Sequence, residues 1–348
     1  MNIKWVFNKH INENRIQELL SLSLNNNQFT NGGPVVKILE EKIKKILIID
    51  DDKDIIAVTN GTVAIWVAIN SIEFYLNKKL RWATQSFTFP ASAQGMLKDI
   101  LICDIDNEGG LELTDNLKEE VDGIIVTNVF GNLVNINKYL DWANTYNKYI
   151  VFDNAATSYS FYNGKNSLNY GNASTLSLHH TKPIGFGEGG IVIIDKLYSK
   201  YLRQLINFGI DNNAENPTWH PLGSNYKMSD ISAAYAIQHL DNFNHIYEKT
   251  IELIQYFKNK ISNKISLYPN FSDDNSFLSC LSCLLPQKDL IIEQKLKLLG
   301  IYCRKYYKPL YFTTNATNIY NQILCIPCHC DMTFQDIDNI VNVILSEY

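Results

Sequence analysis

Lys182 is the residue whose setting most favours covalent chemistry. It lies in the stretch 174–190, which carries four glycines after the lysine and is followed by the β-branched run 191–194. This pattern predicts a loop between two buried strands of a mostly parallel sheet. A lysine in a confined, partly desolvated pocket has a lowered pKa, so its amine can form a Schiff base with an aldehyde such as pyridoxal phosphate. A single lysine is usually a solvated surface residue, so this hypothesis needs support from other residues.

Asp153 is the second residue with a possible chemical role, because it comes at the end of the strand-like segment 149–154. A carboxylate in this position is often a helix cap or a turn former. In a pyridoxal enzyme it can instead keep the ring nitrogen protonated, so that the ring acts as an electron sink. One strand and a loop separate Asp153 from Lys182, so both side chains can reach the same crevice.

Two further segments could hold the rest of such a cofactor. Residues 55–58 form a short strand that runs through a glycine-containing turn into an apolar helix, residues 63–72. Such a turn presents free N–H groups and the positive end of a helix dipole to a phosphate. Phe87 and Phe89 come at the carboxyl end of another strand. One of them could lie against a flat ring, with core packing as the alternative.

The elements that would position these residues alternate between strand and helix. This alternation predicts an α/β fold with a mostly parallel sheet and with ligands at the carboxyl ends of the strands. We expect a large cofactor-binding domain over residues 1–236 and a smaller C-terminal α/β domain over residues 237–348. The predicted helices cover residues 11–24, 35–46, 63–72, 136–143, 229–246, 251–261 and 334–346, and the predicted strands cover residues 55–58, 100–105, 123–130, 149–154, 173–178, 191–194, 277–285 and 301–306.

The composition limits the classes of function. The chain has 348 residues, of which 46% are hydrophobic and 19% charged, as is typical of a globular protein. Its formal net charge of −5 argues against nucleic-acid binding, because no basic surface is available to neutralise phosphates. The sequence shows neither a leader peptide with a cleavage site nor an apolar run long enough to span a membrane. We therefore expect a soluble, cytoplasmic protein without nucleic-acid or membrane partners.

Three other patterns in the sequence could indicate a different ligand, but each indicates it less strongly than the residues above indicate pyridoxal phosphate. Residues 185–190 spell G-x-G-x-x-G, but a dinucleotide-binding turn opens a helix, whereas a strand follows here. Residues 325–329 match the c-type haem motif, which belongs to exported proteins. A zinc site could combine two CxxC pairs, but the strand-like alternation of residues 277–285 need not place their cysteines on one face. We expect no metal and seven reduced cysteines: Cys103, Cys280, Cys283, Cys303, Cys325, Cys328 and Cys330.

Taken together, these features resemble the DegT/DnrJ/EryC1/StrS family of pyridoxal phosphate-dependent sugar aminotransferases over nearly the whole chain. The resemblance implies the aspartate aminotransferase-like fold (fold type I), pyridoxal 5′-phosphate as cofactor, and a homodimer with shared active sites. The family's usual reaction moves an amino group from L-glutamate to a nucleotide-linked keto-sugar. The segments that carry the resemblance are residues 33–40 (GPVVKILE), 59–64 (TNGTVA), 87–91 (FTFPA), 177–182 (SLHHTK), 187–190 (GEGG), 223–229 (GSNYKMS) and 307–310 (YKPL).

The same resemblance implies a role for individual residues. Lys182 would form the Schiff base with the cofactor and act as the catalytic residue, and Asp153 would pair with the pyridine nitrogen. Phe89 would stack on the ring. Asn225 would reach the cofactor phosphate from the neighbouring subunit, and the other phosphate contacts would be Gly61, Thr62 and Ser177. The expected substrate contacts are His180, Lys227 and Tyr307, and the candidates for holding a nucleotide diphosphate are Arg203, Lys227 and Arg304.

One departure from the family concerns the substrate. Where the family generally has Gln or His three residues after the aspartate, this chain has Ala156, and Asn154, Thr157 or an adjacent histidine could supply the missing polar group. Because Lys182 is retained, transamination is favoured over two alternatives, a ketosugar dehydratase and a non-catalytic regulatory protein. The expected acceptor is a dTDP-4-keto-6-deoxy sugar, aminated at C4 or C3, for a surface polysaccharide such as the O-antigen of lipopolysaccharide.

Overall fold

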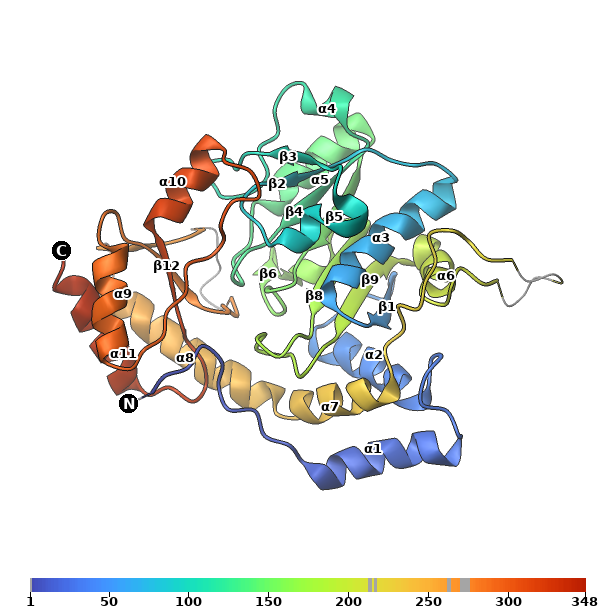
Figure 1. Cartoon of the computed structure of the whole chain (residues 1–348), viewed down its shortest axis with the longest axis horizontal. Helices are drawn as coiled ribbons and strands as arrows, with labels where there is room; N and C mark the ends of the chain where they lie inside the picture. Colours follow the sequence, from blue (N-terminus) through green and yellow to red (C-terminus); the bar gives the residue numbers. More distant parts are fainter. Residues whose placement is uncertain (1, 212–214, 216–217, 262–263, 270–275) are drawn as a thin grey trace.

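The computed structural model describes residues 2–211, 215, 218–261, 264–269 and 276–348, which form a large central sheet and a smaller C-terminal sheet (Figure 1). Within the large sheet only β9 runs antiparallel to its neighbours, which confirms the prediction of a mostly parallel sheet. Its seven strands lie in the order β1 (Lys53–Val58), β9 (Gly190–Asp195), β8 (Ala173–Ser177), β5 (Tyr149–Asp153), β4 (Gly123–Thr127), β2 (Trp82–Gln85) and β3 (Leu101–Cys103).

Helices cover both faces of the large sheet because its strands carry apolar side chains on both sides. On β1, Ile55 and Ala57 pack with α1 (Glu13–Asn25), α2 (Pro34–Ile46) and α7 (Asp230–Leu240). Ile56 and Val58 alternate with them and pack with α3 (Gly61–Leu76) and α6 (Lys196–Leu205) on the other face. The helix α5 (Ile136–Tyr146) covers β4 and β5 (Figure 1). This three-layer arrangement is the usual way to bury a sheet that is apolar on both faces.

Several short elements complete this part of the chain. They connect strands of the large sheet. They are the 3-10 turns Pro90–Ala93, Gly95–Leu97 and Ser167–Asn169, the helix α4 (Leu117–Glu120), and the hairpin of β6 (Phe161–Tyr162) and β7 (Lys165–Asn166).

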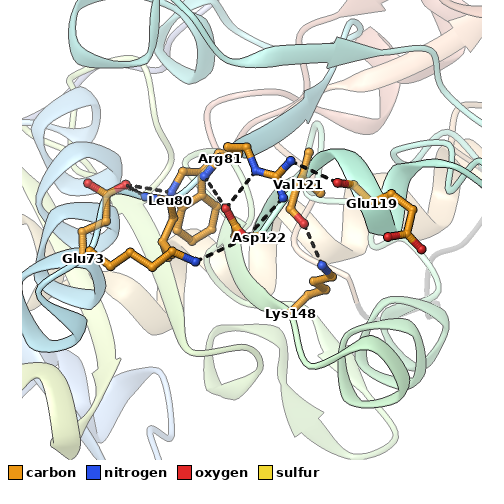
Figure 2. Close-up of polar contacts among 9 residues, drawn as sticks. Glu73, Leu80, Arg81, Glu119, Val121, Asp122 and Lys148 are labelled. Carbon is orange, nitrogen blue, oxygen red and sulfur yellow. Dashed lines mark hydrogen bonds and ion pairs between the residues drawn. The ribbon is translucent and has the colours of Figure 1, made fainter.

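Polar side chains tie together the amino ends of β2 and β4 (Figure 2). Asp122 Oδ2 accepts from the backbone N–H of Arg81 at 2.9 Å and from its Nε at 3.1 Å. The buried carboxylate of Glu73, on α3, accepts from Leu80 N at 3.1 Å and from Trp82 Nε1 at 3.2 Å. These contacts fix the register of β2 against β4, so that the carboxyl ends of both strands reach the opposite edge of the sheet at the same level.

The smaller sheet consists of three antiparallel strands, β10 (Ser266–Leu267), β11 (Leu281–Leu284) and β12 (Ile323–Ile326). Its core is separate from those of the large sheet and includes apolar side chains of the covering helices. These helices are α8 (Phe243–Ile261), α9 (Asp289–Leu298) and α11 (Phe334–Leu345), and a further helix, α10 (Thr314–Gln322), precedes β12.

One predicted helix is wrong. The structure interrupts the predicted helix 229–246 after Leu240, and the chain resumes helical form at Phe243 and continues without a break to Ile261. The interruption falls at Asp241 and Asn242, where the carbonyl of Asn242 accepts from Ile246 N at 3.1 Å. Asp and Asn favour helix ends, since their short polar side chains compete with helical hydrogen bonding.

The predicted strand 301–306 is also absent as a regular strand. Ile301 instead forms an isolated bridge with Ile3, and Arg304 one with Cys325. The predicted domain boundary at residue 236 stays a prediction. Phe243, at the start of α8, packs in the core that includes β1. Residues in the later turns of α8 pack in the core of the smaller sheet. Within the described residues, no helix is both long and apolar enough to cross a membrane.

Candidate active site

A cavity of about 720 Å³ opens at the carboxyl ends of β4, β5 and β8. It is also lined by Ser279 and Cys280, which come just before β11, and by Tyr306, in the segment before α10. This position agrees with the expectation that ligands bind where parallel strands end. Of the residues predicted from the sequence, the cavity brings together Gly61, Thr62, Phe89, Asp153, Ser177, Lys182, Arg304 and Tyr307.

Lys182 and Asp153 are ionisable groups of opposite charge that line this cavity. Burial lowers the pKa of the Lys182 amine, and the nearby Asp153 carboxylate opposes this shift. Burial raises the pKa of the Asp153 carboxyl, against the hydrogen bond from Ala155 N, the charge of Lys182 and the hydrogen bond from Ser92. A lowered pKa provides the neutral amine that attack on an aldehyde requires.

Asp153 is buried, with only 2% of the residue exposed, and two hydrogen bonds hold its carboxylate. Its Oδ1 accepts from Ala155 N at 3.0 Å, and its Oδ2 accepts from Ser92 Oγ at 3.2 Å. Since a buried carboxylate is costly without a partner, a protonated ring nitrogen in the cavity would relieve the desolvation that raises its pKa. The setting of Asp153 therefore fits a pyridoxal ring.

The first turn of α3 has the form of a phosphate cradle. Asn60 caps the helix by accepting from Val63 N at 2.9 Å, and the carbonyl of Asn60 accepts the first helical hydrogen bond, from Ala64 N. The N–H groups of Gly61 and Thr62 come before these donors and can bind an anion. A Cβ on Gly61 would lie 2.9 Å from Ser177 Cβ. Only glycine at this position leaves the approach to Ser177 open.

The two aromatic candidates separate clearly. Phe87 is completely buried and contacts Phe130, Tyr268 and Tyr307 edge to face, so it belongs to the core. Phe89 is 54% exposed and lines the cavity. Phe89 is therefore the member of this pair that can cover a ring bound in the cavity.

Four other predicted residues do not line the cavity. His180 is exposed, and its neighbour His179 lines the cavity instead, with its Nδ1 2.9 Å from Thr181 Oγ1. The remaining three are engaged or exposed elsewhere: Lys227 donates to Asn207 Oδ1 at 2.8 Å, Arg203 pairs with Glu40 at 3.1 Å, and Asn225 is exposed. The expectation for Asn225 concerns the site of a second subunit.

The surroundings of Ala156 show which nearby side chain could supply the polar group that Gln or His generally provides at this position in the family. Asn154 is buried and its Oδ1 accepts from Asn128 Nδ2 at 2.7 Å. Thr157 is buried too, and its Oγ1 donates to the carbonyl of Asn128 at 2.8 Å. Neither side chain lines the cavity, whereas Ala156 and His179 do. His179 is thus the polar alternative that the geometry leaves.

Sequence reasoning missed part of the cavity wall. The Arg304 guanidinium lies over the ring of Trp5 at 5.0 Å, and it donates to the hydroxyl of Tyr306 at 2.5 Å. Trp5 precedes the first helix and no pattern marks it. Cys280, considered above as a zinc ligand, also lines the cavity. All seven cysteines are free thiols, and the described residues contain no group of three or more side chains placed to hold a metal ion.

The sheet has the fold of the fold type I aminotransferases, and the Lys182 and Asp153 pair and the first turn of α3 fit pyridoxal phosphate. The model of the DegT/DnrJ/EryC1/StrS aminotransferase family matches residues 10–345, so the chain belongs to this family. The resemblance seen in the sequence is thereby confirmed, together with the enzyme class and the cofactor, pyridoxal 5′-phosphate.

Named relatives agree with this assignment. The chain is 26% identical to the dTDP-4-amino-4,6-dideoxy-D-glucose transaminase of Shigella dysenteriae, over 93% of each chain. It is 28% identical to the UDP-4-amino-4,6-dideoxy-N-acetyl-beta-L-altrosamine transaminase of Campylobacter jejuni, over 73% of this chain and 75% of the relative. A putative PLP-dependent aminotransferase from Bacillus cereus has the same fold, with a TM-score of 0.84, 22% identity and coverage of 99% of this chain and 100% of that one.

Proposed function

We propose that this sugar aminotransferase moves an amino group from L-glutamate to a nucleotide-linked keto-deoxysugar. The observation that carries the proposal is the cavity in which the Lys182 amine, with its lowered pKa, lies with the Asp153 carboxylate. The proposed acceptor is a dTDP-4-keto-6-deoxy sugar, aminated at C4 or C3. The name of the Shigella relative supports a dTDP-linked sugar, and the Campylobacter relative acts on a UDP-linked one. Such products would serve in surface polysaccharide or glycoconjugate synthesis.

The residues of this chain would share the work as follows. Bound pyridoxal phosphate supplies an electron sink for the carbon that loses its proton. Asp153 holds the proton on the ring nitrogen, and Phe89 shields one face of the ring. Lys182 Nζ would take the proton from the donor Cα in the first half of the reaction and would give a proton to the acceptor carbon in the second, which its lowered pKa permits at neutral pH. The first turn of α3 and Ser177 hold the phosphate.

Arg304 is the proposed contact for the acceptor's diphosphate or for another anionic substrate group. It lines the cavity, and within the described part of the chain it forms no ion pair with a carboxylate. Arg203 and Lys227, the other two candidates, are bonded outside the cavity. Guanidinium groups bind phosphate and carboxylate oxygens strongly. Arg304 therefore replaces those two as the leading candidate.

We further propose a homodimer in which Asn225 completes the phosphate site of the partner. The side chain of Asn225 is exposed, and its backbone forms a bridge with Asn207 that fixes the segment. An exposed polar side chain on a fixed backbone can serve a neighbouring subunit without a large loss of entropy.

The experiment that tests the proposal follows both halves of the reaction. Purified protein with pyridoxal phosphate should absorb at about 410–430 nm, and L-glutamate should shift this band to about 330 nm with release of 2-oxoglutarate. Addition of a dTDP-4-keto-6-deoxy sugar should then restore the first band and give an amino sugar. Lys182→Ala should abolish both changes. Sugar consumption without amine transfer would favour the dehydratase, and no cofactor band would favour a regulatory protein.

A further inference from the structure

The N-terminal strap, defined as residues 3–9, joins the C-terminal part of the molecule to the loop that carries the catalytic lysine. Figure 1 shows the N-terminus beside the C-terminal elements, with the chain then passing towards α1. Ile3 N donates to the carbonyl of Gly300 at 2.8 Å, and Tyr302 N donates to the carbonyl of Ile3 at 3.2 Å. His329 Nε2 donates to the carbonyl of Lys4 at 3.1 Å. Three consecutive contacts therefore fasten the start of the strap.

The middle and end of the strap are fastened too. Trp5 packs against Arg304, and the two side chains together line the cavity. Asn8 donates to Asp331 Oδ2 twice, from its backbone N–H at 2.8 Å and from its Nδ2 at 2.9 Å. Since Asn8 immediately precedes Lys9, these two bonds fix the position from which the Lys9 side chain extends.

Lys9 reaches from the strap into the Lys182 loop, defined as residues 179–187. Its Nζ donates to the carbonyl of Lys182 at 2.8 Å and also to the carbonyl of Gly185. The Lys182 carbonyl accepts from Gly185 N at 3.0 Å as well, and Lys182 N donates to the carbonyl of His179 at 2.8 Å. Lys9 thus reinforces a turn that these two backbone hydrogen bonds form within the loop.

A second side chain holds the intervening residue of the same loop. His239, on α7, donates from Nε2 to the carbonyl of Pro183 at 2.9 Å. Phe7 of the strap stacks on the His239 ring, with centroids 5.8 Å apart and planes 26° apart. The carbonyls of Lys182, Pro183 and Gly185 are therefore all bonded by side chains from outside the loop.

The surroundings of Lys9 favour hydrogen bonds to these loop carbonyls over an ion pair. In the part of the chain that the structure describes, no carboxylate lies within ion-pair distance of Lys9. Its Nζ lies 4.9 Å from the centre of the Phe7 ring, and its titratable neighbours are His180, His239 and the thiol of Cys330. Burial lowers the pKa of Lys9 to about 7. A partly desolvated amine depends on its hydrogen bonds, and those of Lys9 go to the Lys182 loop.

We propose that Lys9 is a positioning residue, which holds the main chain of Lys182 and links it through the strap to the C-terminal part of the molecule. The inference rests on the proposed function, in which Lys182 moves the proton. Misplacement of a catalytic group by a fraction of its reach lowers the rate of the chemical step more than it weakens binding. Loss of Lys9 should therefore reduce the rate of reaction with glutamate at saturation and leave the KM for glutamate nearly unchanged.

The test compares Lys9→Met with Lys4→Met, a matched change of an exposed lysine on the same strap. Hydrogen exchange of residues 179–187 is measured in the cofactor-free protein, and the single-turnover reaction with glutamate in the loaded protein. Lys9→Met should speed exchange in the loop about 10-fold and slow the reaction about 10-fold, with KM changed less than about 2-fold. Lys9→Arg, which retains donors, should recover most of both effects, and Lys4→Met should match the wild type.

Unchanged exchange in Lys9→Met, or faster exchange without a slower reaction, would overturn the inference. If Lys9→Met does not fold, Asn8→Ala serves instead, because it loosens the strap at an exposed position. It should speed exchange in the loop about 3-fold, and an unchanged rate would count against the link. Hydrogen exchange does not depend on the reaction, so failure of the proposed function, seen as an active Lys182→Ala variant, is distinguishable from failure of the role of Lys9.

Discussion

Asp153 and Lys182 show how burial prepares two ionisable groups before the cofactor binds. Burial disfavours the charged form of each, lowering the pKa of the lysine and raising that of the aspartic acid. A protonated ring nitrogen in the cavity would place a cation against the carboxylate, in addition to its hydrogen bonds from Ala155 N and Ser92 Oγ. Burial of Asp153 and Lys182, which makes the site reactive, therefore also destabilises the cofactor-free protein.

Asp153→Asn should separate these two effects. Because the pKa of Asp153 is raised on folding, its contribution to stability is lost as pH rises above the unfolded value of about 3.9. The variant lacks this loss, so urea should unfold the cofactor-free variant at pH 7 no more easily than the wild type. The reaction with glutamate should slow by about 100-fold or more. An unchanged rate would remove Asp153 from its proposed role.

His239 should make stability fall in mild acid. Burial lowers its pKa to about 4, so the unfolded chain, with a value of about 6.5, binds this proton first as pH falls. From pH 7 to pH 5 the free energy of unfolding of the wild type should fall by about 2 kcal/mol more than that of His239→Gln. Urea unfolding at the two pH values measures the difference, and parallel behaviour of the two proteins would contradict it.

At the residue scale, the sequence supported those positions that belong to a strand end or a helix start. Asp153, Ser177 and Gly61 are of this kind, and all three line the cavity. The choice of His180 over His179 could not be made reliably, because the residues after β8 follow no strand periodicity. Trp5 was out of reach, since only tertiary contact with Arg304 brings it to the cavity.

At the element scale, the carboxylate of Glu73 connects α3 to the amino end of β2 (Figure 2). The same helix carries the proposed phosphate cradle at its other end, so Glu73 helps to set the position of that first turn. Strands with strong apolar patterns, such as β1 and β9, were predicted within a few residues. The break between α7 and α8 was not, because the apolar spacing continues through Asp241 and Asn242, and periodicity alone does not register a helix end.

Glu73→Ala should destabilise the protein by about 2–4 kcal/mol, because it leaves the buried Leu80 N and Trp82 Nε1 without an acceptor. Glu119→Ala is the matched control in the same network. The Glu119 side chain is exposed and only its carbonyl accepts from Arg81, at 3.0 Å, so this change should cost less than about 0.5 kcal/mol. Urea unfolding compares the two, and equal losses would contradict the assigned role of Glu73.

At the scale of the whole molecule, the cavity is assembled from distant parts of the chain. The large sheet supplies Asp153 and Ser177, and the segment before α10 supplies Arg304 and Tyr307. The α/β class and the presence of a C-terminal sheet followed from the alternation of patterns. The way in which these distant parts come together did not follow from the sequence, because isolated contacts such as the bridge of Ile3 with Ile301 leave no periodic pattern.

The proposed homodimer with shared active sites predicts complementation between two inactive variants. Lys182→Ala and Asn225→Ala should each lose most of their activity, the second through weaker cofactor binding. After the two are unfolded and refolded together, half of the dimers should be hybrids with one intact site, giving about a quarter of wild-type activity. Activity of the mixture is measured against each variant refolded alone. No recovery in demonstrated hybrid dimers would place Asn225 outside the partner's site.

The strap has a consequence for the order in which the chain folds during synthesis. Residues 3–9 are synthesised long before the groups that hold them, which are at Gly300, Tyr302, His329 and Asp331. The hairpin of β8 and β9, which contains Lys182, needs only local contacts and can form much earlier. The strap is thus made early but can be fixed in place only late. The loop around Lys182 is then fully secured only after translation has passed residue 331.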